Sequence, residues 1–290
     1  SNYLPTKQMQ EQWTTIIKPK TSLLEVNFRE LWQYRDLYRM LVKRDIVTWY
    51  KQTILGPLWF FIQPIMTTIM FMVVFGGIAG ISTDGLPQPL FYLAGICLWQ
   101  YFAESLNQTS NTFIQNAPLF GKVYFPRLVV PFATVTSNLV RLAIQMGLFF
   151  MVFAYYMIFT DAPLAPNIYL LLTPLLIAIL AGLALGFGIL FSSLTTKYRD
   201  LTFLLTFLVQ LWMYATPVIY PLSTIENERI KFVMQLNPIT SIIETFKFGM
   251  LGVGSFSWAA LAYSVGFMVL LLTLGIIVFN RIQRTFMDTV

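Results

Sequence analysis

The sequence predicts an all-α integral membrane protein, and three observations lead to that prediction. The 290 residues are 57% hydrophobic and only 11% charged, whereas a soluble domain carries about 25% charged residues. No charged side chain occurs between Lys51 and Asp84, a run of 32 residues that exceeds the roughly 20 needed to cross a bilayer as a helix. Basic residues lie at the ends of the apolar runs, as membrane topology requires, so nucleic acid is not an expected partner.

Several site chemistries are excluded by composition. A single cysteine, Cys97, excludes an intrachain disulfide and a cysteine-based zinc cluster. Histidine is absent, which removes the commonest metal ligand and the commonest general base. We therefore predict no catalytic residue and no metal site. The first 50 residues are polar and charged, so no cleavable signal peptide is visible and the first crossing is expected to direct insertion.

Residues 1–57 are predicted to form a cytoplasmic N-terminal arm followed by an amphipathic interface helix. Pro5 and Pro19 interrupt the polar arm over residues 1–26. Asn27 and Glu30 have the spacing of a capping box, and apolar residues recur every three to four positions up to Val42. This pattern predicts a helix that lies in the membrane interface. A helix packed on a soluble partner is the alternative, and the two can hold together.

The chain is organised around the stretch from Lys43 to Pro64, where charge stops abruptly after Lys51. Gly56-Pro57 suits the start of a spanning helix, because proline at a first turn gives up an N–H that has no partner there. The stretch is either an ordinary cytoplasmic flank or a pivot between a surface helix and a spanning helix.

Six spans are expected in a transmembrane domain covering residues 58–280, with a cytoplasmic tail at 281–290. Their predicted ranges are Leu58 to Ile81, Pro89 to Phe113, Phe132 to Phe159, Ile168 to Leu194, Leu201 to Pro221 and Trp258 to Phe279. Nine of the 19 basic residues precede the first span, and the short loops on that side carry more. Both termini are therefore predicted to be cytoplasmic.

Two connecting segments are too apolar for ordinary loops. Ile114 to Pro131 exposes aromatic residues beside Lys122 and Arg127, which suits either insertion into a groove on a cytoplasmic partner or a position flat on the membrane. Pro217 to Ser257 has an apolar stripe and several prolines. We predict two re-entrant outer gate helices there, between the fifth and sixth spans, with a small external cap as the alternative.

Glu104 and Arg141 are the charged residues deepest in the second and third spans. Each lies about ten residues from the cytoplasmic end, which at 1.5 Å per residue places both roughly 15 Å deep. Isolated charges at such depth cost several kcal/mol. We expect a structural Glu104–Arg141 pair. The alternative is that Arg141 faces a conduit and meets an anionic substrate.

Three blocks of the sequence together resemble one family. They are Arg44-Asp45 through Tyr50-Lys51-Gln52-Thr53 to Leu55-Gly56-Pro57-Leu58-Trp59 with Gln63-Pro64, then Arg199-Asp200-Leu201 leading to Tyr214-Ala215-Thr216-Pro217-Val218-Ile219-Tyr220-Pro221, then Leu236-Asn237-Pro238-Ile239 before Glu244. The chain resembles the permease subunit of bacterial ABC exporters for lipid-linked O-antigen, capsule or teichoic acid polymers. The match covers nearly the whole chain in order.

The resemblance implies an inner-membrane homodimer clasped by two cytoplasmic ATPase subunits, which would bind the ATP and Mg²⁺. No phosphate loop of the Gly-x-x-x-x-Gly-Lys-Ser/Thr type occurs here, so this chain is expected to be neither an ATPase nor another enzyme and to bind no cofactor itself. By the resemblance, coupling to the ATPase falls to Phe28, Leu31, Trp32, Arg35, Arg39, Arg44, Asp45, Leu119, Phe120, Lys122, Tyr124 and Arg127. The implied outer gate contains Pro217, Tyr220, Pro221, Asn237, Pro238 and Glu244.

A sugar polymer in a conduit needs flat surfaces that bind weakly, and aromatic faces provide them. The expected channel residues are Trp59, Phe60, Tyr92, Trp99, Tyr101, Phe203, Phe207, Trp212 and Tyr214. Core packing or an interfacial belt is the alternative for each one.

The predicted function is export of a lipid-linked polysaccharide. One rival is an ion-coupled secondary transporter or a flippase of lipid-linked sugars, but matching broken helices in two inverted halves are not evident. The other rival, an intramembrane enzyme, would need a carboxylate pair or a nucleophile and base at one depth.

Overall fold

The computed structural model describes residues 28–51 and 53–289, without the side chains of Phe28 and of residues 283–289. The predicted arm at 1–26 lies outside these residues. All regular structure in the described ranges is helical. The elements are α1 (Phe28–Gln33), α2 (Arg35–Lys51), η1 (Gly56–Leu58), α3 (Trp59–Phe71), η2 (Met72–Ile78), α4 (Gln88–Ser110), α5 (Thr112–Phe120), α6 (Val129–Phe159), η3 (Ile168–Leu172), α7 (Thr173–Lys197), α8 (Leu201–Tyr214), η4 (Leu222–Thr224), α9 (Glu228–Gln235), α10 (Pro238–Leu251) and α11 (Trp258–Thr289).

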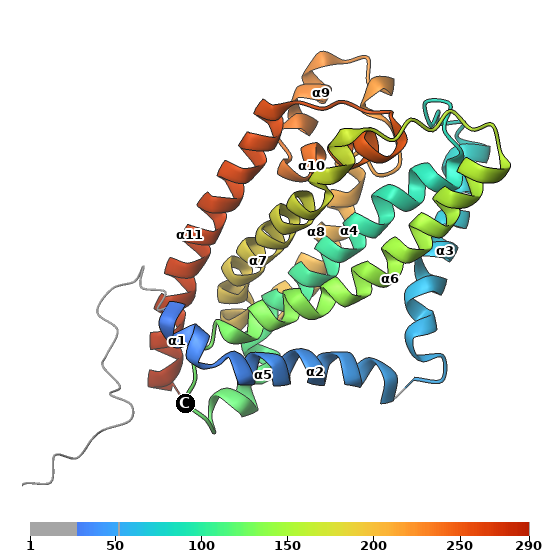
Figure 1. Ribbon diagram of the computed structural model, residues 1–290. Coiled ribbons are helices and arrows are strands. Elements are labelled where there is room, and N and C mark those ends of the chain that lie inside the picture. The colour runs from blue at the N-terminus through green and yellow to red at the C-terminus, as the bar shows by residue number, and fades with distance from the viewer. Residues whose placement is uncertain (1–27, 52, 290) are drawn as a thin grey trace, which may run out of the picture.

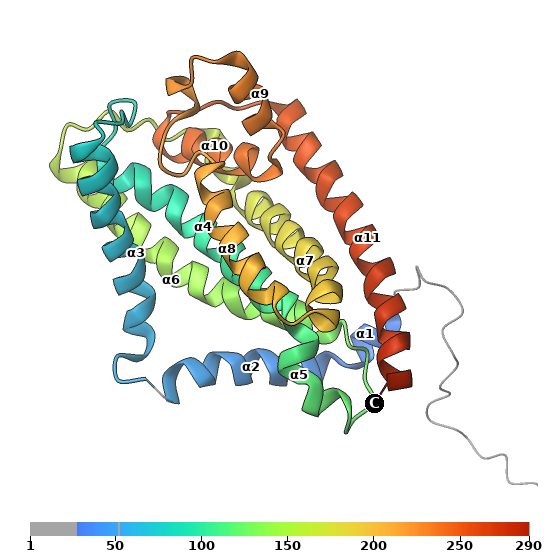
Figure 2. The ribbon, with the colours of Figure 1, turned by 180° about the vertical axis from the view of Figure 1, so that it is seen from behind.

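The long helices run side by side as a bundle with two distinct ends (Figures 1 and 2). At one end α2 lies across the bundle, close to α1, α5 and the C-terminal end of α11. At the other end lie α9 and α10. We call these the α2 end and the α10 end.

Four helical stretches within the described residues are long and apolar enough to cross a membrane. They are Gly56–Ile78, Val129–Phe159, Ile168–Lys197 and Trp258–Ile282. The two other predicted spans differ from these. Helix α8 has 14 residues, or about 21 Å at 1.5 Å per residue, against a hydrocarbon core of about 30 Å. Helix α4 has 23 residues but is more polar.

The polarity of α4 follows from its position at the centre of the bundle. Every residue from 90 to 99 is buried, and the helix packs on α3, α6, α7, α8 and α10. A helix surrounded by protein can carry polar side chains, because neighbouring helices supply their partners. A side chain that faces lipid has no such partner, so the helices with wide lipid-facing surfaces are more apolar than α4.

The predicted corner between surface and spanning helices is present. Helix α2 continues to Lys51, further than the predicted end at Val42, and α3 rises from the far end of α2 (Figure 1). Gly56 has φ +50°, a left-handed conformation that costs other residues about 1–2 kcal/mol. Pro57 follows it in the short turn η1. The backbone therefore turns from α2 into α3 within a few residues (Figure 1).

Three predicted segments take a different form in the structure. We expected a loop from Ile114, but residues Thr112–Phe120 form helix α5. The helix forms because the apolar residues there pack on the bundle. Helix α11 continues to Thr289, so the predicted tail is largely helical. In the predicted outer segment, α10 is buried but the short α9 is mostly exposed, so only α10 enters the bundle.

Candidate functional site

Helix α2 is fastened to α6 along one side and open on the other. Tyr38 donates its hydroxyl to Thr136 Oγ1 at 2.7 Å, and Ser137 Oγ donates to Asp45 Oδ2 at 3.3 Å. Leu41 is buried between these two contacts. Trp32 on α1 is 70% exposed. The other predicted coupling residues there divide in the same way: Arg35, Arg39 and Arg44 are exposed, and Leu31 and Asp45 are half-buried.

The segment after α5 has a buried root and an exposed tip. Phe120 and Arg127 are both buried, with the Arg127 guanidinium 5.2 Å from the Phe120 ring centroid. Lys122, Val123 and Tyr124 are exposed. The prediction that Phe120 and Arg127 lie on a docking surface is corrected: they anchor the segment, because an aromatic ring and a guanidinium stack well in a buried setting.

The tip of this segment approaches the start of the interface helix. Partial desolvation of the Tyr124 hydroxyl, followed by the nearby Glu30 carboxylate and Tyr34, raises the pKa of Tyr124 although the residue as a whole is exposed. Leu119, another predicted coupling residue, is half-buried beside the tip. Two exposed elements that are about ninety residues apart in the sequence therefore share the α2 end (Figure 1).

Glu104 and Arg141 lie together between α4 and α6. Arg141 Nη1 is 3.3 Å from Glu104 Oε1. Gln108, one turn further along α4, donates Nε2 to the same carboxylate oxygen at 2.5 Å. Asn138 of α6 donates Nδ2 to Gln108 Oε1 at 3.1 Å. These four side chains form a polar seam in the apolar bundle. The amide side chains of Gln108 and Asn138 were not predicted as partners of this pair. Their spacing could have indicated it, because Gln108 lies one turn from Glu104 and Asn138 nearly one turn from Arg141.

Arg141 joins this seam to the corner between α2 and α3. Its guanidinium carbon lies 5.4 Å from the Trp49 ring of α2 and 4.8 Å from the Phe60 ring of α3. The two rings meet edge to face at 5.2 Å. One arginine thus contacts α2, α3 and α4 from its place on α6, so a movement of α2 disturbs partners on three other helices.

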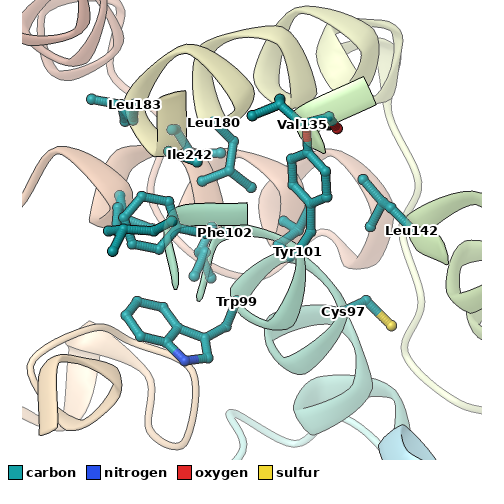
Figure 3. Close-up of a cluster of buried hydrophobic side chains, with 14 of the residues drawn as sticks. Cys97, Trp99, Tyr101, Phe102, Val135, Leu142, Leu180, Leu183 and Ile242 are labelled. Atoms are coloured by element: carbon teal, nitrogen blue, oxygen red, sulfur yellow. Dashed lines mark hydrogen bonds between the residues drawn. The ribbon is translucent and has the colours of Figure 1, made fainter. Parts of the chain in front are cut away.

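Eight of the nine predicted channel residues fall into two groups, and the ninth, Trp212, is half-buried. Phe60, Tyr92, Trp99 and Tyr101 are buried inside the subunit, and their assignment to a conduit is corrected to core packing. Figure 3 shows Trp99 and Tyr101 among other buried side chains; Tyr101 donates to Val135 O at 3.3 Å, and Trp99 lies 6.3 Å from the half-buried Trp212 ring. Trp59, Phe203, Phe207 and Tyr214 are exposed, Phe203 to 80%.

The predicted gate residues lie together at the α10 end. Asn237 donates Nδ2 to Ala215 O at 3.1 Å and to Thr216 Oγ1 at 2.9 Å, and it caps α10 by accepting from Ile239 N. Tyr220 donates its hydroxyl to Tyr214 O at 2.6 Å. The chain after α8 is therefore folded back onto the start of α10, with Pro217, Pro221 and Pro238 buried.

Lys247 of α10 lies in the same region but was not among the predicted gate residues. It is 1% exposed and donates Nζ to Pro217 O at 2.7 Å, with the ammonium 3.6 Å from the Phe91 ring centroid. Burial lowers the pKa of Lys247 to about 8, against the opposing effects of Glu244 and Asp84. Glu244 is also buried, which raises the pKa of its carboxyl group. The polar face of α10 is inside the protein because neighbouring elements cover both faces.

The part of the chain that the structure describes has no group of three acidic, cysteine or histidine side chains that could hold a metal ion.

Comparison with known proteins gives the family. The family model described as "ABC-2 type transporter" matches residues 36–251, from the start of α2 to the end of α10. The chain belongs to the ABC-2 type transporter family.

Curated relatives of this ABC-2 family member cover most of its length. One, from Myxococcus xanthus, is 29% identical over 221 residues, which are 76% of this chain and 82% of the relative. Two from Klebsiella pneumoniae are 26% and 24% identical over 259 residues, which are 87% of this chain and 94% of each relative. All three are named O-antigen export system permease protein RfbA.

Proposed function

We propose that this chain is the membrane permease subunit of an ABC transporter that exports a lipid-linked polysaccharide, of the O-antigen class, across the cytoplasmic membrane. Membership of the ABC-2 family and three relatives named for O-antigen export support it. The observation that carries it is the α2 end, where exposed aromatic and cationic side chains on α1, α2 and the 122–124 tip lie at the same end of the bundle.

In this proposal two ATPase subunits bind the α2 end and supply ATP, Mg²⁺ and hydrolysis. Their approach moves α2, and Arg141 passes that movement to α3 and α4. The fastening of α2 to α6 through Tyr38 and Asp45 supports this role, because a helix held by directional contacts transmits force that a loosely held helix would absorb. This chain itself does no covalent chemistry.

The proposed topology has six crossings with both termini in the cytoplasm. The crowding of basic residues before Lys51 supports that orientation by the positive-inside rule. In this arrangement α4 crosses within the protein interior, and α8 crosses part of the bilayer before its chain turns back into α10. The α10 end then faces outward and serves as a re-entrant gate, supported by the burial of α10.

The proposed transport path lies between two copies of the chain. Apolar side chains on η1, α3 and α8 are exposed in the single subunit, and only lipid or another protein chain can cover them in a membrane. They include Leu58, Trp59, Ile65, Met66, Ile69, Phe203, Leu204, Phe207, Leu208, Leu211 and Tyr214. The exposed aromatic residues in this set keep the role predicted for them, as weakly binding surfaces for sugar faces.

The test is reconstitution with the ATPase subunits encoded beside this chain. The complex in nanodiscs is expected to hydrolyse ATP faster when lipid-linked glycan is added, and inverted vesicles are expected to take the glycan up only with ATP. Arg35→Glu with Arg39→Glu should weaken ATPase association. The control is Arg229→Glu, an exposed arginine at the α10 end, which should leave it intact. A chain that binds no ATPase subunit but carries ions along a gradient would contradict the proposal.

A further inference from the structure

A cavity of about 280 Å³ opens at the α10 end beside the buried Glu244. Its walls come from η4, α9, α10, the segment after α10, and the start of α11. The volume lies just below the range of about 300–1,000 Å³ typical of small-molecule sites. A cavity of this size admits one small ligand of the dimensions of a single sugar.

Among the described residues that line this cavity, Glu244 is the only one with a carboxylate. It is 3% exposed, and its Oε2 accepts one hydrogen bond, from Ser255 N at 3.2 Å. Lys247, three residues further along α10, gives its hydrogen bond to Pro217 O instead. A buried carboxylate is stabilised by two or three hydrogen-bond donors. A ligand with hydroxyl groups would supply the donors that Glu244 needs in addition to Ser255 N.

The rest of the lining divides into apolar and polar parts, as a sugar ring does. Leu222, Leu236 and Ala260 form apolar walls, together with the exposed ring of Phe232. Gln235, Ser255 and Ser257 add polar groups; Ser257 Oγ accepts from Ala260 N at 3.4 Å, which leaves its hydroxyl hydrogen able to donate. Apolar walls with a few placed polar groups are typical of ligand sites.

The lining suits a sugar better than a metal ion. Calcium takes six to eight oxygen ligands, several of them from carboxylates, and Glu244 alone supplies a charge here. Thr240 and Ser241 have committed hydroxyls, since Thr240 donates to Met234 O at 2.7 Å and Ser241 pairs with Ser264 at 2.6 Å. The polar groups that remain available to a ligand can form hydrogen bonds with two neighbouring hydroxyl groups of a sugar.

We infer that this cavity is a saccharide-binding site, in which Glu244 accepts hydrogen bonds from neighbouring hydroxyls of one sugar unit of the exported polymer. The inference rests on the proposed function, because the orientation proposed there puts the cavity on the outer side of the membrane. A unit held at this place binds after it has crossed. The site would therefore hold the emerging chain without touching the path between subunits.

The test uses saturation-transfer NMR on the complex with its ATPase subunits in nanodiscs. The probes are D-mannose, D-galactose, L-rhamnose and N-acetyl-D-glucosamine, each added alone. At least one is expected to receive saturation. Glu244→Gln is expected to raise its apparent Kd about tenfold or more, since an NH₂ group replaces one of the two acceptor oxygens. Glu226→Gln, an exposed glutamate of the same segment, is the matched control and should bind normally.

A second variant blocks the cavity after folding. Ala260→Cys, at an exposed position on the rim, is purified and then labelled with a bulky maleimide, while the buried Cys97 stays unlabelled. Binding is expected before labelling and lost after it. The inference is overturned if no sugar receives saturation, if binding survives the label, or if CaCl₂ or MgCl₂ alone binds in a Glu244-dependent way. Export with no sugar binding would defeat this inference alone, and sugar binding without export would defeat the proposed function alone.

Discussion

The contact between Arg141 and Glu104 is where single side chains matter most. Reversing either charge alone places two like charges about 3 Å apart in a poorly hydrated seam, which should cost several kcal/mol. The double swap Glu104→Arg with Arg141→Glu should recover much of that loss, with a coupling energy of about 0.5–3 kcal/mol. Recovery stays partial, since an arginine at position 104 leaves the rings of Trp49 and Phe60. Thermal unfolding of the purified subunit measures all three variants.

The exposed pair Asp36 and Arg39 provides the control for this cycle. Its atoms are 3.6 Å apart and its side chains are 83% and 74% exposed. Swapping that pair should change the unfolding temperature little, because exposed pairs contribute about 0–1 kcal/mol. If the double swap in the seam recovers nothing while the surface swap has no effect, the two half-buried charges act separately and the structural pairing is wrong.

Lys247 gives a second prediction for a single residue. Lys247→Met keeps the volume of the side chain but removes the donor to Pro217 O and the cation over Phe91. We expect a loss of about 1–3 kcal/mol, the usual cost of leaving a buried partner unpaired. The half-buried Lys231 of α9 is the matched control, and Lys231→Met should be nearly neutral. Equal stability of the two variants would mean that Lys247 is not needed to hold α10 against the segment at Pro217.

Between elements, close approach decides the packing, and α7 depends on its glycines. A Cβ added at Gly188 would lie 2.5 Å from Thr109 Cβ and 2.6 Å from Thr109 Cγ2 on α4. Gly188→Ala should therefore destabilise the subunit by about 1–3 kcal/mol through overpacking. Gly147→Ala on α6 meets nothing within 4 Å and should be neutral or stabilising by up to about 1 kcal/mol. Thermal unfolding in one detergent compares them; a harmless Gly188→Ala would refute tight α4–α7 packing.

The sequence predicted the positions of the helices better than it predicted which of their side chains are buried. Long apolar runs indicated the helices, and equal depth from the cytoplasmic end indicated that Glu104 and Arg141 would meet. Hydropathy cannot tell a side chain that faces lipid from one that faces protein. Tyr92 and Trp99 were therefore assigned to a conduit, although every residue of α4 from 90 to 99 is buried. For the same reason the sequence does not indicate that Lys247 is buried, since its partner is the Pro217 carbonyl, thirty residues away in the sequence.

At the scale of the molecule, the two ends of the bundle should face opposite sides of the membrane. In a Cys97→Ala background, single cysteines at Trp32 and Val123 probe the α2 end, and single cysteines at Ile78 and Phe232 probe the α10 end; all four wild-type side chains are exposed. A membrane-impermeant maleimide added to intact cells should label only positions 78 and 232. Positions 32 and 123 should need permeabilised cells. Any reversal would overturn the orientation and, with it, the placing of the saccharide cavity outside.

The junction at Arg141 has a thermodynamic consequence. Because this side chain touches Trp49, Phe60 and Glu104, the position of α2 is energetically coupled to the positions of α3 and α4. Linkage of this kind is reciprocal. If nucleotide binding changes the affinity for cargo by some factor, cargo binding must change the affinity for nucleotide by the same factor. A loaded transporter should accordingly hold ATP with a different dissociation constant from an empty one. Exchanging Arg141 for leucine should bring the two constants together.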